Sequence, residues 1–309
     1  MSTKPWPGVT LVLSSMLALC AATGQAGPLL YTVGGDFTSP GAIGVPDSLN
    51  SMDPASAASV TNVRTPVGNG SIGFNGGLVF ANSLLYGVGS DSSGFATLFS
   101  FQTNGLGLTP VSPDFNSSGG AAGIVFQNGL TAAGSTFYAI GAGANGEALY
   151  QIGAGSATFI EGLPTLGGTY AGLAWDPVSG AFYAVIAGAN GSDFNGDFLV
   201  RFGFGGPFNI VANLTALDGA PVGTHLSGLA DGGGGILYDI YTNPATLTGQ
   251  LERITVGGST SVSTLYDTQI PLAQNAGVAI VQPTPEPAAG VEIGAGLLLV
   301  SWILNRRKK

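Results

Sequence analysis

Few side chains of this chain could act as an acid, a base or a nucleophile activator, and His225 is its only histidine. An imidazole base would have to be this residue, which lies in the loop-like segment Gly223–Ser227. A Ser-His-Asp arrangement could use Asp218 or Asp231, but no Gly-x-Ser-x-Gly elbow accompanies it. A lone loop histidine without a motif is more often structural or solvated. We therefore predict no catalytic residue.

The sharpest candidate for cation binding is the segment Asp193–Asp197. Alternating oxygen ligands on a glycine-containing turn suit a hard cation such as calcium. The candidate ligands are Asp193, Asn195 and Asp197. Corresponding segments of the neighbouring repeats, Asp91–Gly94 and Gly143–Glu147, have the composition of hairpin turns, and a simple turn explains most of the pattern. A turn and a calcium site both stay open here.

The charge balance limits the partners. Residues 27–284 contain fifteen acidic side chains, no lysine, and as basic residues only Arg64, Arg201 and Arg253. Nucleic acids and anionic lipids are bound through Lys and Arg, so this composition excludes nucleic acid as a partner of the domain. A phosphate-binding loop with a lysine is excluded for the same reason. A neutral glycan or a cation-bridged matrix is easier to accommodate.

Two short signatures recur along the chain, which indicates a repeat architecture. The first has an apolar residue, Tyr, any residue and an apolar β-former, and occurs at Leu30–Val33, Leu85–Val88, Phe137–Ile140, Phe182–Val185 and Leu237–Ile240. The second begins with Gly and occurs at Gly77–Val79, Gly123–Val125, Gly172–Ala174, Gly228–Ala230 and Gly277–Ile280. The 52 glycines and the 45% hydrophobic content favour short strands joined by tight turns around a real core.

The two ends of this repeat region are complementary. The Tyr signature at Leu30 has no Gly signature before it, and the Gly signature at Gly277 has no Tyr signature after it. If each unit begins with a Gly strand, residues 277–281 complete the unit that starts at Leu30. We therefore predict an all-β, five-bladed β-propeller at residues 27–282, closed by pairing of its N- and C-terminal strands. A β-sandwich and a parallel β-helix are the rival folds, but a sandwich would not predict the complementary ends and a β-helix would show a much shorter period.

Residues 1–26 have the layout of a secretory signal peptide. Lys4 precedes an apolar run, residues 9–22, and small residues follow up to Ala26. A lipoprotein would be acylated at Cys20, but the bulky Leu19 before it speaks against that processing. After cleavage the mature chain has no cysteine, so its fold must be held by packing alone.

The C-terminal residues have three parts. A proline-rich spacer at 283–287 contains Pro285, Glu286 and Pro287, an apolar segment follows at 288–304, and a basic end lies at 305–309. The apolar segment is near the lower length limit of a transmembrane helix, and the basic end is expected on the cytoplasmic side. A plain tail anchor is the alternative to a sorting signal.

This order of Pro-Glu-Pro, apolar run and basic end resembles the PEP-CTERM sorting signal of Gram-negative bacteria. The matching residues are Pro285, Glu286, Pro287, Arg306, Arg307, Lys308 and Lys309, together with the apolar segment between them. The resemblance implies an exported protein that is transiently anchored in the membrane, processed by an exosortase, and then found at the cell surface or outside the cell. Glu292 within the apolar run departs from a permanent anchor but is tolerable in a segment that is removed.

Two functions follow from these observations. The first is a non-enzymatic binding or structural propeller associated with exopolysaccharide, without a cofactor unless calcium binds. The alternative is a propeller enzyme, a lactonase or a glycan-active hydrolase, that uses channel carboxylates and a metal. The position of the acids would distinguish them, because an enzyme needs several acids to converge with His225 at one mouth of the central channel. The acids concerned are Asp36, Asp91, Asp176, Asp231 and Asp239.

Overall fold

The computed structural model describes residues 27–34, 48–67, 73–90, 94–117, 119–126, 129–190, 195–271 and 277–282. Leu29–Val281 forms one compact unit. The expected signal peptide, the Pro-Glu-Pro motif, the apolar segment and the basic end lie outside the described residues. In the part of the chain that is described, no helix is long and apolar enough to cross a membrane.

The described strands form five four-stranded antiparallel sheets, which we number as blades 1 to 5 from the N-terminus. Blade 1 consists of β20 (Gly277–Val281), β1 (Leu29–Gly34), β2 (Ser48–Asp53) and β3 (Ser56–Arg64). Blade 2 consists of β4 (Gly73–Ala81), β5 (Leu84–Ser90), β6 (Ala96–Phe101) and β7 (Thr109–Ser112). Blade 3 consists of β8 (Leu130–Ala133), β9 (Thr136–Gly143), β10 (Gly146–Gly153) and β11 (Ser156–Gly162), preceded by the 3-10 turn η1 (Gly119–Ala121).

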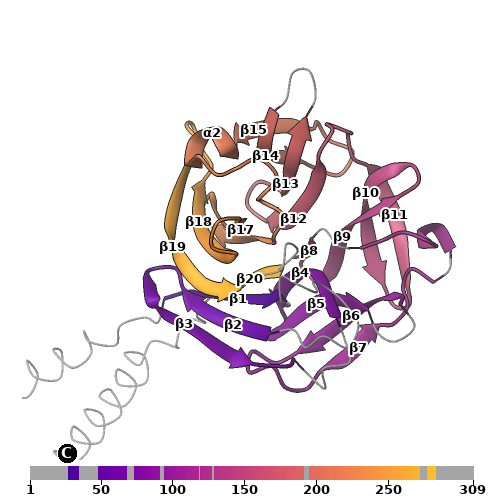
Figure 1. The fold of residues 1–309 in the computed structure, drawn as a ribbon. Helices are drawn as coiled ribbons and strands as arrows, with labels where there is room; N and C mark the ends of the chain where they lie inside the picture. Colours follow the sequence, from indigo (N-terminus) through magenta and orange to yellow (C-terminus); the bar gives the residue numbers. More distant parts are fainter. Residues whose placement is uncertain are drawn as a thin grey trace, which may run out of the picture. The chain divides into compact units, whose positions relative to one another are not determined.

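Blades 4 and 5 complete the ring. Blade 4 consists of β12 (Thr169–Asp176), β13 (Ala181–Asn190), β14 (Asn195–Phe202) and β15 (Asn209–Asn213). Blade 5 consists of β16 (Leu229–Gly233), β17 (Ile236–Asn243), β18 (Thr248–Thr255) and β19 (Ser261–Pro271). A short helix, α2 (Leu214–Asp218), lies in the connection between them. The five sheets are arranged around a common axis, as Figure 1 shows.

The ring is closed by the two ends of the repeat region. β1 pairs with β20 in antiparallel register, with Leu30 opposite Ile280 and Thr32 opposite Val278. The innermost strands of successive blades contact one another in a cycle that returns from β16 through β20 to β4. The five-bladed propeller and its closure by the terminal strands are therefore confirmed, and the free sheet edges that a linear array would leave are avoided.

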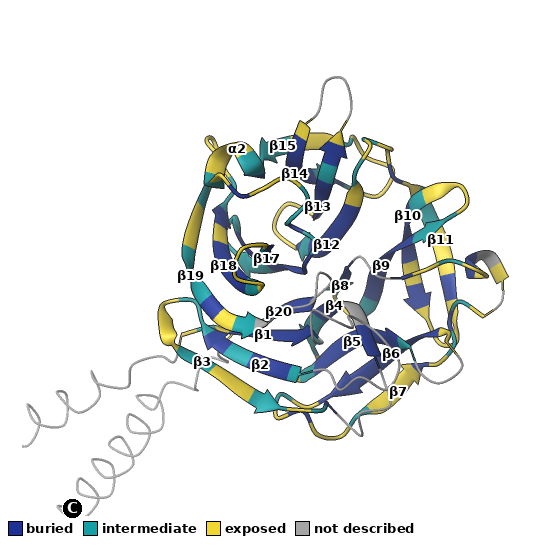
Figure 2. Cartoon of the chain, viewed as in Figure 1, coloured by how far each residue is buried: buried dark blue, intermediate teal, exposed yellow. Residues whose placement is uncertain are grey.

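The Tyr signature marks the second strand of every blade. Its tyrosines are 7–8% exposed in all five blades: Tyr31, Tyr86, Tyr138, Tyr183 and Tyr238. Figure 2 shows the same gradient in each sheet, with buried residues along the inner strands and exposed ones along the outer strands. The repeat predicted from sequence is thus a repeat of side-chain environment.

The Gly signature was assigned wrongly in one blade. Gly123–Val125 is not an inner strand, and Val125 joins the sheet only through an isolated bridge to Ala142. Gly123 has a φ of +75° and open space around it, so it is a turn glycine. The inner strand of blade 3 is β8, which follows Gly129.

One glycine in each blade, within or directly before the inner strand, allows the blades to approach the axis. A Cβ atom on any of them would lie less than 3.0 Å from the backbone of the next blade: Gly77, Gly129, Gly172, Gly228 and Gly277. Each glycine faces the one that follows it around the ring, and Gly277 faces the backbone of Gly77 and Leu78. This close approach, which no other residue permits, is the physical reason for the signature.

Apolar clusters fill the spaces between neighbouring blades. The blade 3–4 interface is rich in aromatic rings, including Tyr138, Tyr170, Phe182, Phe198 and Phe202. The blade 4–5 interface is aliphatic, with Val185, Leu199, Leu229, Leu237 and Ile254 among its buried residues. It also encloses a group of five ionisable side chains, described below.

Candidate functional site

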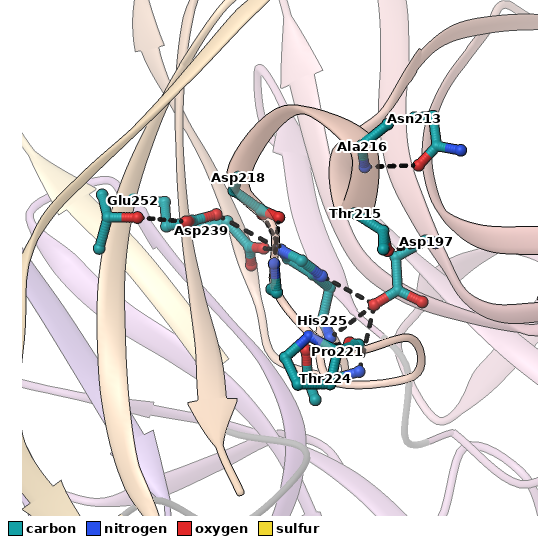
Figure 3. A network of polar contacts seen from close by, with 12 residues as sticks. Asp197, Asn213, Thr215, Ala216, Asp218, Pro221, Thr224, His225, Asp239 and Glu252 are labelled. Atoms are coloured by element: carbon teal, nitrogen blue, oxygen red, sulfur yellow. Dashed lines mark hydrogen bonds and ion pairs between the residues drawn. The ribbon is translucent and has the colours of Figure 1, made fainter. Parts of the chain in front are cut away.

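A group of ionisable side chains lies buried between blades 4 and 5, and we call it the His225 cluster (Figure 3). Its members are Asp197 on β14, Asp218 at the end of α2, His225 in the loop before β16, Asp239 on β17 and Glu252 on β18. Their side chains are at most 1% exposed. The fold therefore brings four carboxyl groups to one imidazole.

The short helix α2 fixes the position of Asp218. Asn213 caps its N-terminus by accepting a hydrogen bond from the Ala216 N–H, and Gly219 ends it in the left-handed conformation with a φ of 76°. The Asp218 Oδ1 atom then accepts a hydrogen bond from the Ala220 N–H. The other carboxylate oxygen is left to face His225.

Asp197 organises the loop that carries the histidine. Its Oδ1 atom accepts hydrogen bonds from the Gly188 and Gly223 N–H groups, and Oδ2 accepts from the Thr224 and His225 N–H groups. The same Oδ2 atom lies 2.8 Å from His225 Nδ1. Because a carboxylate accepts, Nδ1 donates to it, and the remaining ring nitrogen, Nε2, points to the other acids.

Three carboxylates surround His225 Nε2. The Asp218 Oδ2 atom lies at 3.0 Å, the Glu252 Oε2 atom at 3.3 Å and the Asp239 Oδ2 atom at 4.0 Å. Glu252 is held from its far side by the Thr264 hydroxyl, which donates to Oε1 at 2.9 Å. The Nε2 side of the ring is therefore a pocket of oxygen atoms.

These contacts change the acidity of the groups. Burial alone would lower the pKa of His225, but hydrogen bonds with Asp197, Asp218 and Glu252 raise it well above its usual value. Burial raises the pKa of Asp239 to about 7, because it outweighs the lowering effect of the His225 charge and the Glu252 charge adds to it. Burial also acts on Asp197, but hydrogen bonds from His225 and backbone N–H groups lower its pKa overall.

Asp239 and Glu252 lie directly opposite each other on β17 and β18. Like charges in such a cross-strand pair are destabilising. The four other blades place small uncharged residues at the Asp239 position, the third of the Tyr signature: Thr32, Gly87, Ala139 and Ala184. An aspartate at this repeat position was the sequence signal that could have revealed the cluster.

The predicted calcium loop is described only in part. Asp193 lies outside the described residues, Asn195 is exposed at the start of β14, and Asp197 is fully buried with both oxygens engaged. Calcium binding by this segment stays a prediction. The structure instead gives Asp197 a role in holding the loop of His225.

Of the three described acids that were expected to reveal an enzyme, two do not lie beside the histidine. Of the five, Asp239 alone is a member of the His225 cluster among the described residues. Asp176 ends β12 and Asp231 lies on β16, where burial and the neighbouring Asp176 charge raise the pKa of Asp231. Asp36 and Asp91 lie outside the described residues.

The His225 cluster is too enclosed to receive an organic substrate in this structure. Its groups can share protons, or they can hold a cation of atomic size. Asp218, His225 and Glu252 each offer one ligand atom, and these three atoms lie within 4.8 Å of one another. The arrangement is thus suited to a structural centre.

No protein-family model and no curated protein sequence matches the chain. Solved structures with a similar fold include the nidogen/laminin complex, at 12% identity, a TM-score of 0.47, and coverage of 82% of this chain and 99% of that chain. TolB from Acinetobacter baumannii matches at 11% identity, a TM-score of 0.42, and coverage of 88% and 71%. An α-L-arabinofuranosidase from Clostridium thermocellum matches at 10% identity, a TM-score of 0.49, and coverage of 75% and 84%. The propeller assignment rests on the strand pairing of this chain itself.

Proposed function

We propose that the protein is an exported, non-enzymatic β-propeller that binds or organises extracellular polysaccharide. The observation that carries this proposal is the burial of the His225 cluster, whose side chains are at most 1% exposed. The lone histidine and its acids are used inside the fold, where a substrate does not reach them. An acidic ring without lysine favours a neutral or cation-bridged glycan over an anionic polymer.

Aromatic residues at the surface supply a contact area for such a partner. Phe204 is 50% exposed and packs against Tyr138, Trp175 and Phe182, with ring centroids 5.3, 5.8 and 5.1 Å away. Trp175 is itself partly exposed. Rigid aromatic faces give a large contact at low entropic cost, and they complement the apolar faces of sugar rings.

The proposed route out of the cell uses the two ends of the chain. Residues 1–26 would direct export, and Pro285 to Lys309 would be recognised by an exosortase after transient anchoring in the membrane. Processing near Glu286 would leave the ring whole, because the closing strand β20 ends at Val281.

The test has two measurements on protein purified from its own cells. Mass spectrometry is expected to find a C-terminus near Glu286, and retention of residues 288–309 would overturn the sorting proposal. Co-sedimentation with the cells' exopolysaccharide is expected to weaken in Phe204→Ala and to persist in the exposed control Val178→Ala. Hydrolysis of a glycan or lactone that Asp231→Asn abolishes would replace the binding function by an enzymatic one.

A further inference from the structure

The His225 cluster holds four carboxyl groups, which in their ionised forms would carry more negative charge than one histidine can balance. Four carboxyl groups meet a single imidazole, and even a protonated ring would neutralise one of them. Asp239 is fully buried, and neither of its carboxylate oxygens accepts a hydrogen bond of good geometry from the described residues. An uncompensated buried carboxylate is costly, so the site lacks a positive partner.

We propose that the blade 4–5 interface holds one divalent transition-metal ion of the kind that combines imidazole and carboxylate ligands, such as Zn²⁺ or Mn²⁺. The ligands are His225 Nε2 and one carboxylate oxygen each from Asp218, Asp239 and Glu252. Such an ion supplies the positive charge that Asp239 lacks.

The distances from His225 Nε2 to the carboxylate oxygens are close to those of a metal site. In a tetrahedral site with metal–ligand bonds of about 2.0 Å, neighbouring donor atoms lie about 3.3 Å apart. The observed distances from Nε2 to the three carboxylate oxygens are 3.0, 3.3 and 4.0 Å. Small shifts of side chains, chiefly of Asp239, would bring all four atoms into one coordination shell.

The atoms that do not face the ion are already held. His225 Nδ1 donates to Asp197, the Asp218 Oδ1 atom accepts from Ala220, and the Glu252 Oε1 atom accepts from Thr264. A carboxylate that fixes the far nitrogen of a metal-binding histidine orients the ring and strengthens it as a ligand. A buried imidazole requires partners only for its own two nitrogen atoms, whereas here the far oxygens of Asp218 and Glu252 are held as well.

The ligand types decide between kinds of ion. Calcium and magnesium prefer oxygen ligands alone, whereas imidazole suits zinc and other first-row transition metals. The nitrogen ligand therefore separates this site from the calcium predicted at Asp193–Asp197. An ion here would fasten the β15–β16 connection, which carries Asp218 and His225, to strands β17 and β18 of blade 5.

The experiment uses the full chain, stripped with a chelator and then titrated with ZnCl₂, MnCl₂ or CaCl₂. We expect elemental analysis to find one zinc or manganese ion per chain and the thermal midpoint to rise by about 5–10 °C at a hundredfold excess over Kd. Asp239→Ala gives blade 5 the residue found at Ala184 and Ala139, so this variant is expected to fold. It and Glu252→Gln should lose the ion and the rise in midpoint, whereas Asp231→Asn should keep both.

Several outcomes would overturn the proposal. One is a thermal midpoint unaffected by zinc, manganese and chelator, which would leave the cluster as a histidine ring held by acids. Another is metal binding that Asp239→Ala and Glu252→Gln leave unchanged. Calcium binding alone, insensitive to both substitutions, would overturn it too and would support the Asp193–Asp197 loop instead.

Discussion

The two interfaces of blade 4 each contain an acidic side chain at an equivalent position, but the residues around that side chain differ. Glu147 on β10 and Asp197 on β14 occupy equivalent positions in the third strands of their blades. Each lies three residues before the residue that pairs with the third position of the Tyr signature, which is Tyr150 in blade 3 and Val200 in blade 4. Glu147 accepts the Tyr170 N–H from the chain entering blade 4. Asp197 accepts N–H groups from the chain entering blade 5, but there the loop also brings a histidine.

The difference lies in what surrounds the equivalent acids. Beyond Glu147, the blade 3–4 interface is made of aromatic and aliphatic side chains, whose burial is favourable without a particular geometry. Beyond Asp197, the blade 4–5 interface contains His225 and three further carboxyl groups, whose burial is favourable only if every charge is matched. The blade 3–4 interface is stabilised mainly by the apolar surface area that it buries, whereas the blade 4–5 interface depends on a specific set of polar contacts.

The largest expected effect comes from removing Asp197, the acid at this position of the blade 4–5 interface. Asp197→Ala should lower the free energy of unfolding by about 4 kcal/mol, because it leaves a buried histidine and four backbone N–H groups without their acceptor. Urea denaturation of the full chain measures this. The matched variant Glu147→Ala should cost about 2 kcal/mol, since it removes the acceptor of the Tyr170 N–H. Equal losses would show that the two interfaces are alike.

The aromatic interface should respond to the loss of volume alone. Phe182 is fully buried and contacts Tyr138, Trp175 and Phe202, with ring centroids 5.3, 4.7 and 5.6 Å away. Phe182→Ala should lower the free energy of unfolding by about 3 kcal/mol. The loss is expected to be the same with chelator and with added zinc, and a loss that depends on the ion would link this interface to the His225 cluster.

The same contrast explains what the sequence could reveal. The Tyr and Gly signatures mark residues that every blade needs. The five Tyr signatures therefore indicate the number of blades, and the unmatched signatures at Leu30 and Gly277 indicate ring closure. The assignment of Gly123 to an inner strand is wrong because a glycine in a turn and a glycine beside the propeller axis look the same in the sequence. The close approach to the next blade that distinguishes Gly129 is a property of packing.

The His225 cluster is not repeated, and it was not predicted. The sequence indicates His225 as a loop residue and Asp197 as a candidate ligand in a turn. It does not predict their contact, because that contact depends on how one blade packs against the next. Asp218 lies in a connection without a repeat signature. Asp239 alone carried a readable signal, because it is charged where the other blades are small and neutral.

A smaller effect, with a sign that depends on conditions, is expected at Asp239. In chelator, Asp239→Ala should raise the free energy of unfolding by about 1–2 kcal/mol, because it removes a buried carboxylate without a partner. With zinc in excess, the same variant should be less stable than the unaltered protein, since it cannot gain from binding. Chemical denaturation in both buffers checks the reversal. A loss of stability in both would mean that Asp239 is compensated by contacts within the chain.

The smallest effect concerns the hydroxyl that holds Glu252. Thr264→Val on β19 removes one hydrogen bond to Oε1 and should cost about 1 kcal/mol in chelator. Because that contact orients a ligand, the variant should also bind zinc about 10-fold more weakly.

Thr268→Val on the same strand is the matched control, since its hydroxyl donates to the Gly249 carbonyl and not to the cluster. Thr268→Val should lower the free energy of unfolding by a similar amount and leave zinc affinity unchanged. Comparison of the two variants therefore distinguishes a threonine that stabilises β19 alone from one that also orients a residue of the His225 cluster. If both variants bind zinc as tightly as the unaltered protein, Thr264 stabilises β19 and does not tune the site.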